Sequence, residues 1–213
     1  MAKSPLIAAL VASAFCASAA MADQCGPTRG RPGQFDYYLL SLSWAPSYCA
    51  TPSGRQNRQE CGPGTDYGMV VHGLWPQFTN GQWPQCCQAV APLTPSPTID
   101  KLSRIMIGSS LMEHEWEKHG SCVTTRQDAY FGSIGQVVAK LGLAPTLSAK
   151  GITTIKVSEL KRHWSLPAPS ITTRCKGKRL GEIHICLDLK LDPIACPAAE
   201  IEADNCPGSV ALH

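Results

Sequence analysis

The chain has few charged residues and no long apolar run, and each shortage excludes a class of protein. Charged residues make up 16% of the 213 residues, against about 25% in typical soluble domains. The balance of 19 Lys and Arg against 16 Asp and Glu gives a net charge of only +3, so any basic function must be local. The composition excludes disorder, a collagen, a coiled coil and a multi-span membrane protein. One domain is the default at this length.

The apolar stretch at the start of the chain, Leu6 to Ala20, is shorter than the roughly 18 residues that span a membrane. It follows Lys3 and ends at Ala20-Met21-Ala22, which is the order of a secretory signal peptide with its cleavage site. We therefore expect residues 1–22 to be removed, leaving residues 23–213 as a secreted or periplasmic protein without a membrane anchor. No asparagine begins an N-x-S/T sequon, which favours a bacterial origin.

The chain has eleven cysteines but no C-x-x-C pair, which argues against a structural zinc site. Cleavage removes Cys16 and leaves an even number of cysteines in an oxidising compartment. Adjacent cysteines do not suit ordinary disulfide geometry, so two neighbouring members of the set must bridge elsewhere. The residues expected to form disulfides are Cys25, Cys49, Cys61, Cys86, Cys87, Cys122, Cys175, Cys186, Cys196 and Cys206.

Strand-like segments lie toward both ends of the chain, with helix-like segments between them. The pattern predicts strands over residues 35–43, 68–72, 171–175 and 180–190. It predicts helices over residues 99–107, 109–119, 126–143 and 158–164. Proline-rich segments 46–65 and 79–97 are expected to be irregular. The order indicates an α+β fold: a single disulfide-stapled domain in which an antiparallel β-sheet packs against several α-helices.

The segment LMEHEWEKHGSC, residues 111–122, is unusually rich in ionisable groups. On a helix, Glu115, Lys118 and His119 share one face, and His114 lies beside them. Such a face can accept a proton, orient the base and stabilise an anion. The alternative is a solvated, salt-bridged helix face. A metal site is disfavoured because the two histidines diverge around the helix, unlike those of H-E-x-x-H.

A further histidine, His72, ends a short apolar strand in the sequence VHGLWPQ. With Gly73, Trp75 and Pro76 after it, the imidazole would lie at a strand edge beside an aromatic plane. This arrangement suits a general acid or base next to a surface that stacks a ring. A core histidine beside a packing tryptophan is the alternative for this segment taken alone.

Together, HGLWPQ (72–77) and HEWEKHGSC (114–122) resemble the two active-site segments of the ribonuclease T2 family. FDYYLLSLSWAPSYC (35–49) is similar to that family's first strand and cysteine loop, and GEIHICLD (181–188) to its late strand. The resemblance covers most of the mature chain, thinly between motifs. The chain departs from the family at Met69, Leu111 and Met112, where aromatic residues are usual, but these residues keep apolar bulk.

The resemblance implies a metal-independent endoribonuclease that acts on single-stranded RNA and needs no cofactor. We expect a monomer, although the sequence does not determine the oligomeric state. A base removes the ribose 2′-OH proton, the oxygen attacks phosphorus, and an acid protonates the departing 5′-oxygen, leaving a 2′,3′-cyclic phosphate. DNA lacks the 2′-OH and is expected to be inert. The alternative is a non-enzymatic secreted binding module on the same scaffold. The intact ionisable residues of both motifs argue against it.

Residue roles follow from the same resemblance. It implies that His119 is the general base and His72 the general acid, although one sequence cannot order two imidazoles and the roles can be exchanged. The other implied roles are transition-state support by Glu115 and Lys118, phosphate binding by His114 and base stacking by Trp75. Gln77 is expected to bind substrate, but it occupies a position that varies within the family, so the base preference stays open. The implied disulfides are Cys49–Cys61, Cys186–Cys196, Cys175–Cys206, Cys122 with Cys86 or Cys87, and Cys25 with the remaining one.

The other histidines have plainer interpretations. We expect His163 at the surface at a helix end, His184 on the more exposed face of its strand, and His213 in the tail. A basic cluster surrounds the predicted hairpin turn at 176–178: Arg174, Lys176, Lys178 and Arg179. It could follow an RNA backbone, but a solvated hairpin tip is the favoured interpretation.

Overall fold

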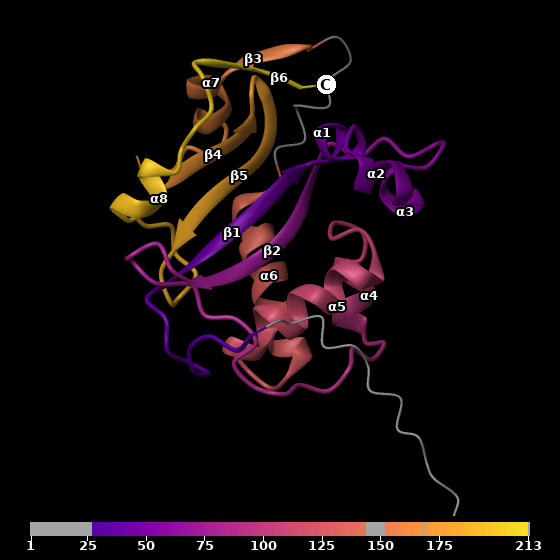
Figure 1. The fold of residues 1–213 in the computed structure, drawn as a ribbon, viewed down its shortest axis with the longest axis vertical. Helices are drawn as coiled ribbons and strands as arrows, with labels where there is room; N and C mark the ends of the chain where they lie inside the picture. The colour runs from indigo at the N-terminus through magenta and orange to yellow at the C-terminus, as the bar shows by residue number, and fades with distance from the viewer. Residues whose placement is uncertain (1–26, 144–151, 168, 213) are drawn as a thin grey trace, which may run out of the picture.

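The computed structural model describes residues 27–143, 152–167 and 169–212, and in this part of the chain it has a curved six-stranded sheet flanked by helices (Figure 1). The strands are β1 (Tyr37–Trp44), β2 (Met69–Gln77), β3 (Thr154–Lys156), β4 (Ile171–Lys176), β5 (Arg179–Leu187) and β6 (Ser209–Ala211). Their order is β2-β1-β5-β6-β3, and β4 pairs with β5. All pairs are antiparallel except a single parallel pairing of β5 with β6. The predicted α+β class is confirmed.

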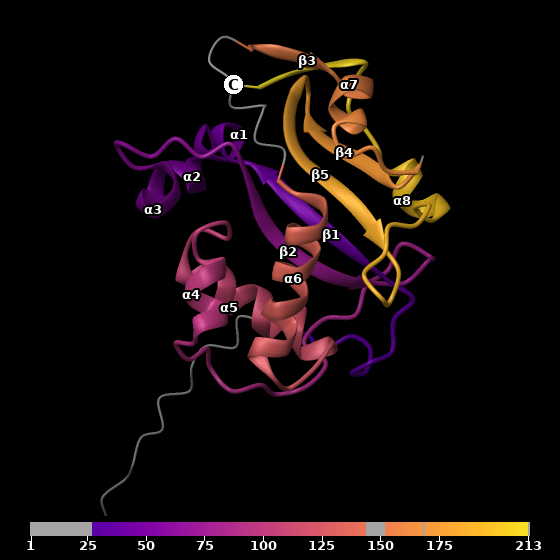
Figure 2. The same ribbon diagram turned by 180° about the vertical axis from the view of Figure 1, so that it is seen from behind.

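The longer helices lie close to where the pattern predicts them. The described helices are α1 (Ala45–Cys49), α2 (Pro52–Gln56), α3 (Arg58–Cys61), α4 (Pro97–Leu102), α5 (Ser109–Lys118), the 3-10 turn η1 (Gly120–Cys122), α6 (Gln127–Leu141), α7 (Val157–Arg162) and α8 (Ala198–Glu202). From behind, α6 crosses one face of the sheet, with α4 and α5 on the β2 side (Figure 2). In the part of the chain described, no helix is long and apolar enough to cross a membrane.

Two predicted boundaries are wrong. Residues 46–65 were expected to be irregular, but they form α1 to α3, because Thr51 and Asn57 accept backbone N–H groups of α2 and α3 and cap them. The helix predicted over 99–107 ends at Leu102. Residues beyond it leave the helix so that Met106 and Ile107 can be buried, which a pattern of apolar spacing alone does not reveal.

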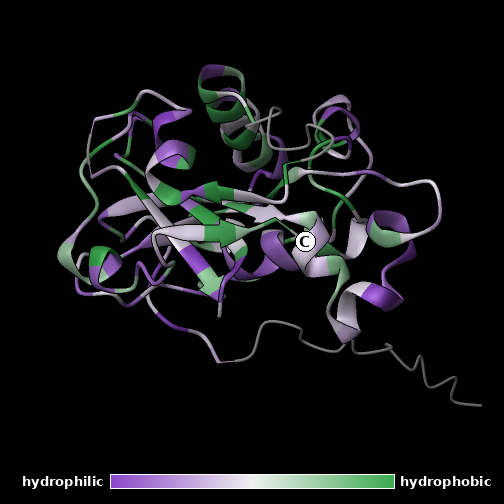
Figure 3. Cartoon of the chain, turned by 90° about the horizontal axis from the view of Figure 1, so that it is seen from above, coloured by the Kyte–Doolittle hydropathy of each residue, from purple (hydrophilic) through white to green (hydrophobic). Residues whose placement is uncertain are grey.

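The main core lies between the sheet and α6. Helix α6 buries Tyr130, Ile134 and Val137 from one face, as helical spacing requires, with Phe131 beside them. They pack with the core-facing residues of β1, β2 and β5. A second, smaller cluster on the opposite face is formed by Tyr37, Leu39, Cys186 and Cys196. Figure 3 shows the apolar residues concentrated on the central strands.

Strand β5 is therefore covered on both faces, and this corrects one expectation. His184 was expected on the more exposed face of this strand, but it is only 5% exposed. The short helix α8 lies against this face, and its Glu200 bonds to His184. A strand's alternating pattern shows which residues share a face but not whether a distant helix covers it.

Four disulfides are described: Cys49–Cys61, Cys175–Cys206, Cys186–Cys196 and Cys87–Cys122. They confirm three predicted pairs and select Cys87 as the partner of Cys122. Cys86 is also disulfide-bonded. The predicted signal peptide, the pairing of Cys25 and the tail residue His213 lie outside the described residues.

Candidate active site

All seven residues singled out for catalysis or substrate binding line one open hollow of about 370 Å³. Strand β2 contributes three of them and the end of α5 contributes four. They are His72, Trp75, Gln77, His114, Glu115, Lys118 and His119. Two segments about forty residues apart in the sequence are thus brought to one place.

A bulge in β2 aims His72 away from the regular alternation of the strand. Ser41 of β1 pairs with Gly73 and the next residue, Leu42, pairs with Val71, so His72 is the extra residue between them. Bulges redirect side chains in this way beside functional sites. Val71 remains in the core while His72 turns toward the hollow.

Gly73 allows β2 and α5 to approach closely. A Cβ atom at Gly73 would lie 2.1 Å from Glu115 Oε2 and 2.5 Å from Trp75 Nε1. In the space left free, the indole N–H of Trp75 donates to Glu115 Oε2 at 2.6 Å. The glycine of the first motif is therefore needed to accommodate the glutamate of the second.

His72 is surrounded by carboxylates. Its Nδ1 lies 2.6 Å from Glu182 Oε1, and its Nε2 lies 3.7 Å from Glu115 Oε1. Desolvation lowers the pKa of His72, but the hydrogen bond to Glu182 and the negative charges of Glu115 and Glu182 outweigh it, and the net shift is upward. The protonated form is favoured at this position.

His119 has the opposite environment. It is 4% exposed, and its Nδ1 has no hydrogen-bond partner among the described residues. Its ring stacks on the indole of Trp75, with 5.4 Å between ring centroids. Burial, with the positive charge of Lys118 next in importance, holds the pKa of His119 well below its usual value. The neutral form, which can accept a proton, is favoured at this position.

The acidic group between these histidines is also perturbed. Burial raises the pKa of Glu115 to about 7, against the opposing effects of His72, the Trp75 N–H and Lys118. Burial and Lys118 lower the pKa of His114. Perturbed ionisable groups gathered in one hollow are typical of an active site. No group of three or more metal-ligating side chains occurs among the residues that the structure describes.

The comparison with known proteins agrees with the motifs. The model of the ribonuclease T2 family matches residues 35–196, which is most of the chain. The chain belongs to the ribonuclease T2 family. The T2 match includes both β2 and α5, and so every residue that lines the hollow from the two motifs.

Relatives within the T2 family include a bacterial protein. A probable ribonuclease of Haemophilus influenzae is 36% identical over 76% of this chain and 61% of its own length, so the chain spans less than two thirds of that relative. Intracellular ribonuclease LX of Solanum lycopersicum is 33% identical over 76% of this chain and 78% of its own length. The solved structure of RNase NT in complex with 5′-AMP is 27% identical, with a TM-score of 0.60, over 77% of this chain and 91% of that one.

Sequence reasoning missed several residues of the site. Trp83 lines the same hollow and is 39% exposed. Glu182 bonds to His72 and also to His184. The available signal for Glu182 and His184 was their position two residues apart on an otherwise apolar strand, GEIHICL, where charge is costly unless it is paired.

The remaining charged residues lie mostly where the sequence placed them. His163 is exposed at the end of α7, as predicted. Lys176, Lys178 and Arg179 are exposed at the hairpin end of β4 and β5, as both interpretations of this basic cluster require. Arg174 is the exception, because its guanidinium bonds to Glu200 Oε1 at 2.5 Å.

Proposed function

We propose that the protein is a metal-independent endoribonuclease that cleaves single-stranded RNA by transesterification through a 2′,3′-cyclic phosphate. The observation that carries the proposal is the placement of two imidazoles in one hollow, one bonded to a carboxylate and the other buried against Trp75. His72 favours the protonated form and His119 the neutral form. Cleavage of an RNA phosphodiester needs one group of each kind.

The roles of the two histidines follow from their surroundings. Neutral His119 takes the proton of the ribose 2′-OH, and the oxygen attacks the adjacent phosphorus. Protonated His72 gives its proton to the departing 5′-oxygen. Since Glu182 occupies Nδ1, Nε2 is the nitrogen that donates. This assignment orders the acid and the base, which the sequence left open.

Charge on the phosphoryl oxygens is stabilised from α5. Lys118 supplies a positive charge at the hollow, and His114 lines the same wall. Glu115, with its pKa raised to about 7, is mostly protonated in mildly acidic solution. It can then donate a hydrogen bond to a phosphoryl oxygen instead of repelling it.

The aromatic residues of the hollow support nucleotide binding. Trp75 was expected to stack a base, but its indole is already bonded to Glu115 and stacked on His119. Trp83 is more exposed at the rim of the hollow and offers a second flat surface. Buried Gln77 lines the same hollow and can read the base through its amide. The complex of RNase NT with 5′-AMP supports a nucleotide site in this fold.

The N-terminal pattern supports a secreted or periplasmic location after loss of residues 1–22. The disulfides also fit an oxidising compartment. We further propose that the enzyme acts as a monomer, because every residue assigned a role comes from the same chain. DNA is not a substrate in this mechanism since it has no 2′-OH.

The proposal is tested with the mature, oxidised protein, a single-stranded RNA, its DNA counterpart and excess EDTA. The wild type is expected to cleave the RNA to 2′,3′-cyclic phosphate ends and to leave the DNA intact, and His72→Ala and His119→Ala to lose this activity. A folded but inert wild type would contradict the proposal and favour a binding module. Loss of activity in EDTA would contradict the metal-independent mechanism.

A further inference from the structure

From His72, a chain of paired ionisable side chains runs across the face of the sheet that carries the smaller core cluster. Glu182 on β5 lies between two imidazoles, with Oε1 2.6 Å from His72 Nδ1 and Oε2 3.0 Å from His184 Nε2. His184 is two residues farther along the same strand, so both side chains point to the same face. Glu182 therefore uses one oxygen for each histidine.

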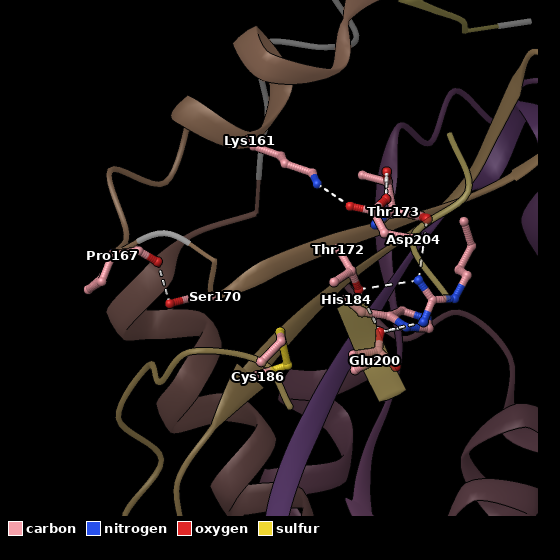
Figure 4. The surroundings of a disulfide bond; sticks show 11 residues. Lys161, Pro167, Ser170, Thr172, Thr173, His184, Cys186, Glu200 and Asp204 are labelled. Carbon is pink, nitrogen blue, oxygen red and sulfur yellow. Dashed lines mark hydrogen bonds and ion pairs between the residues drawn. A yellow bond between two sulfur atoms is a disulfide. The ribbon is translucent and has the colours of Figure 1, made fainter. Parts of the chain in front are cut away.

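The chain continues from β5 to α8 and β4. His184 Nδ1 lies 3.0 Å from Glu200 Oε1. The same oxygen accepts hydrogen bonds at 2.5 Å from Arg174 and from Thr172. Figure 4 shows His184, Thr172 and Glu200 grouped in this way beside the Cys186 disulfide. The four ionisable residues behind His72 come from three elements of the fold.

The hydrogen bonds fix the protonation states. A carboxylate only accepts, and a neutral imidazole has a single N–H. Because both nitrogens of His184 contact carboxylates, His184 is an imidazolium with two donors. Its positive charge and that of Arg174 balance Glu182 and Glu200. The pKa of Glu182 is held well below its usual range by its bonds to His184 and His72, which outweigh desolvation. A negative charge is thus kept beneath His72.

We propose that Glu182 is a positioning residue: it accepts a hydrogen bond from the Nδ1 proton of His72 and so fixes the ring with Nε2 aimed at the leaving oxygen. His184, Glu200 and Arg174 hold Glu182 in place. This inference rests on the proposed function. It adds Glu182 to Glu115 as a second carboxylate beside the proposed general acid, His72. Glu182 lies on β5, which contains neither of the two motifs.

The charges around His72 explain why this anion is needed. From α5, Lys118 disfavours the protonated ring and Glu115 favours it. Glu115 is itself partly neutral, with a pKa of about 7. From α3, buried Glu60 acts at longer range, and from β1 the hydroxyl of Ser43 bonds to Glu182 at 3.3 Å. Since its pKa lies far below neutrality, Glu182 is the partner whose charge persists when Glu115 is protonated.

The test compares Glu182→Gln with wild type on two substrates that differ in their need for an acid. A dinucleoside phosphate releases a ribose 5′-oxygen, which must be protonated. A nucleoside 3′-(4-nitrophenyl phosphate) releases a stable phenolate, which does not. We expect Glu182→Gln to lower kcat on the dinucleotide about 10- to 100-fold, as for other residues that orient a functional group, and to change kcat on the nitrophenyl ester less than about 3-fold.

The pH profile gives an independent readout. Removing the charge of Glu182 lowers the pKa of His72, so the descending alkaline limb of kcat/KM for the dinucleotide moves to lower pH. In the background of His72→Ala, Glu182→Gln is expected to cause no further loss, because its effect passes through His72. The matched control is Glu202→Gln, an exposed carboxylate at the end of α8, which is expected to match wild type on both substrates.

Equal losses on both substrates, or additive losses with His72→Ala, would overturn the inference and assign Glu182 a purely structural role. Unchanged dinucleotide cleavage would overturn it as well. If Glu182→Gln does not fold, Glu200→Gln, at the other end of this series of paired side chains, is expected to show the same selective loss on the dinucleotide, a few-fold in size. If Glu200→Gln shows no selective loss, the inference is overturned as well. A wild type that cleaves neither substrate would instead refute the proposed function.

Discussion

The two histidines of the site lie in contrasting environments although they line the same hollow. His72 comes from a bulged strand and is bonded to a carboxylate that is itself bonded to an imidazolium. His119 comes from the end of a helix and is buried against the ring of Trp75, and its Nδ1 has no hydrogen-bond partner within the described part of the chain. One side chain is surrounded by compensating charge and the other is removed from water.

The difference shows two separate ways of setting a proton preference. Paired carboxylates raise the pKa of His72, whereas burial beside Lys118 lowers that of His119. In the proposed mechanism, two identical side chains serve as an acid and a base because the backbone elements that carry them place them in different surroundings. The residues that create the contrast are therefore as important as the histidines.

Removing either imidazole is expected to have the largest effect on activity, because it eliminates one side of this comparison. His119→Ala is expected to lower kcat/KM about 10³-fold or more on a dinucleoside phosphate and on its nitrophenyl ester analogue, since both need the 2′-OH proton removed. His72→Ala is expected to lose as much on the dinucleotide but at least about 10-fold less on the ester. Equal losses of His72→Ala on both substrates would contradict its role as the acid.

A smaller but still large effect is expected from Gly73→Ala. The new methyl group would meet Glu115 and Trp75 at distances that force one of them to move, so the hydrogen bond between them is broken and kcat falls about 10²-fold. Gly132→Ala on α6 is the matched control, because nothing lies within 4 Å of its Cβ position. Near-UV circular dichroism checks the fold, and a fully active Gly73→Ala would show that the close approach is not required.

The pH dependence of kcat/KM sharpens the comparison. In the proposed mechanism the ascending limb is expected to follow His119, whose lowered pKa places it at acidic pH, and the descending limb to follow His72, whose raised pKa extends activity upward. A broad bell-shaped profile is therefore expected. Lys118→Met removes a charge that lowers both pKa values, so both limbs are expected to move to higher pH by less than about one unit, with kcat about 10²-fold lower. Limbs that do not move would contradict the electrostatic assignment.

The smallest effect is expected at the hairpin end. Lys176 and Arg179 line a second hollow, about 400 Å³ in volume, that also reaches His72. If His72 protonates the departing 5′-oxygen as proposed, the departing strand leaves on this side. The double variant Lys176→Ala/Arg179→Ala is expected to raise KM a few-fold for long RNA and to weaken its salt dependence, without effect on a dinucleotide. Lys178→Ala, at the exposed turn outside this hollow, is the control, and an equal effect there would indicate only general charge attraction.

The sequence predicts best what its two motifs encode directly. His72, Glu115, Lys118 and His119 could be named because their residue types and order are specific, and the structure brings them together. The α+β class and the main strands follow from apolar patterning. The disulfide choice between Cys86 and Cys87 could not be decided, because adjacent residues offer nearly the same sequence separation.

The missed features depend on contacts between distant segments. His184 was misplaced because the cover over its strand comes from α8, a helix of five residues that no periodicity reveals. The three-residue strands β3 and β6 exist only as partners in the sheet. Glu182 needed the register of β5 against β1 to be placed near His72. Local sequence patterns predict helices, strands and motifs, whereas contacts between distant segments determine which residues are buried.

The Cys87–Cys122 disulfide makes the site sensitive to thiol chemistry. It joins the segment after β2 to a residue three positions beyond His119, across a sequence separation of 35, and the backbone N–H of Cys86 bonds to the carbonyl of Lys118 at 2.8 Å. Closing a loop of this length lowers the conformational entropy of the unfolded chain and so stabilises the folded state by about 4 kcal/mol. In a reducing cytosol the newly made chain would lack this clamp on the catalytic helix end. If the chain is exported as proposed, oxidation would add this restraint only after the protein has left the cytosol and its RNA.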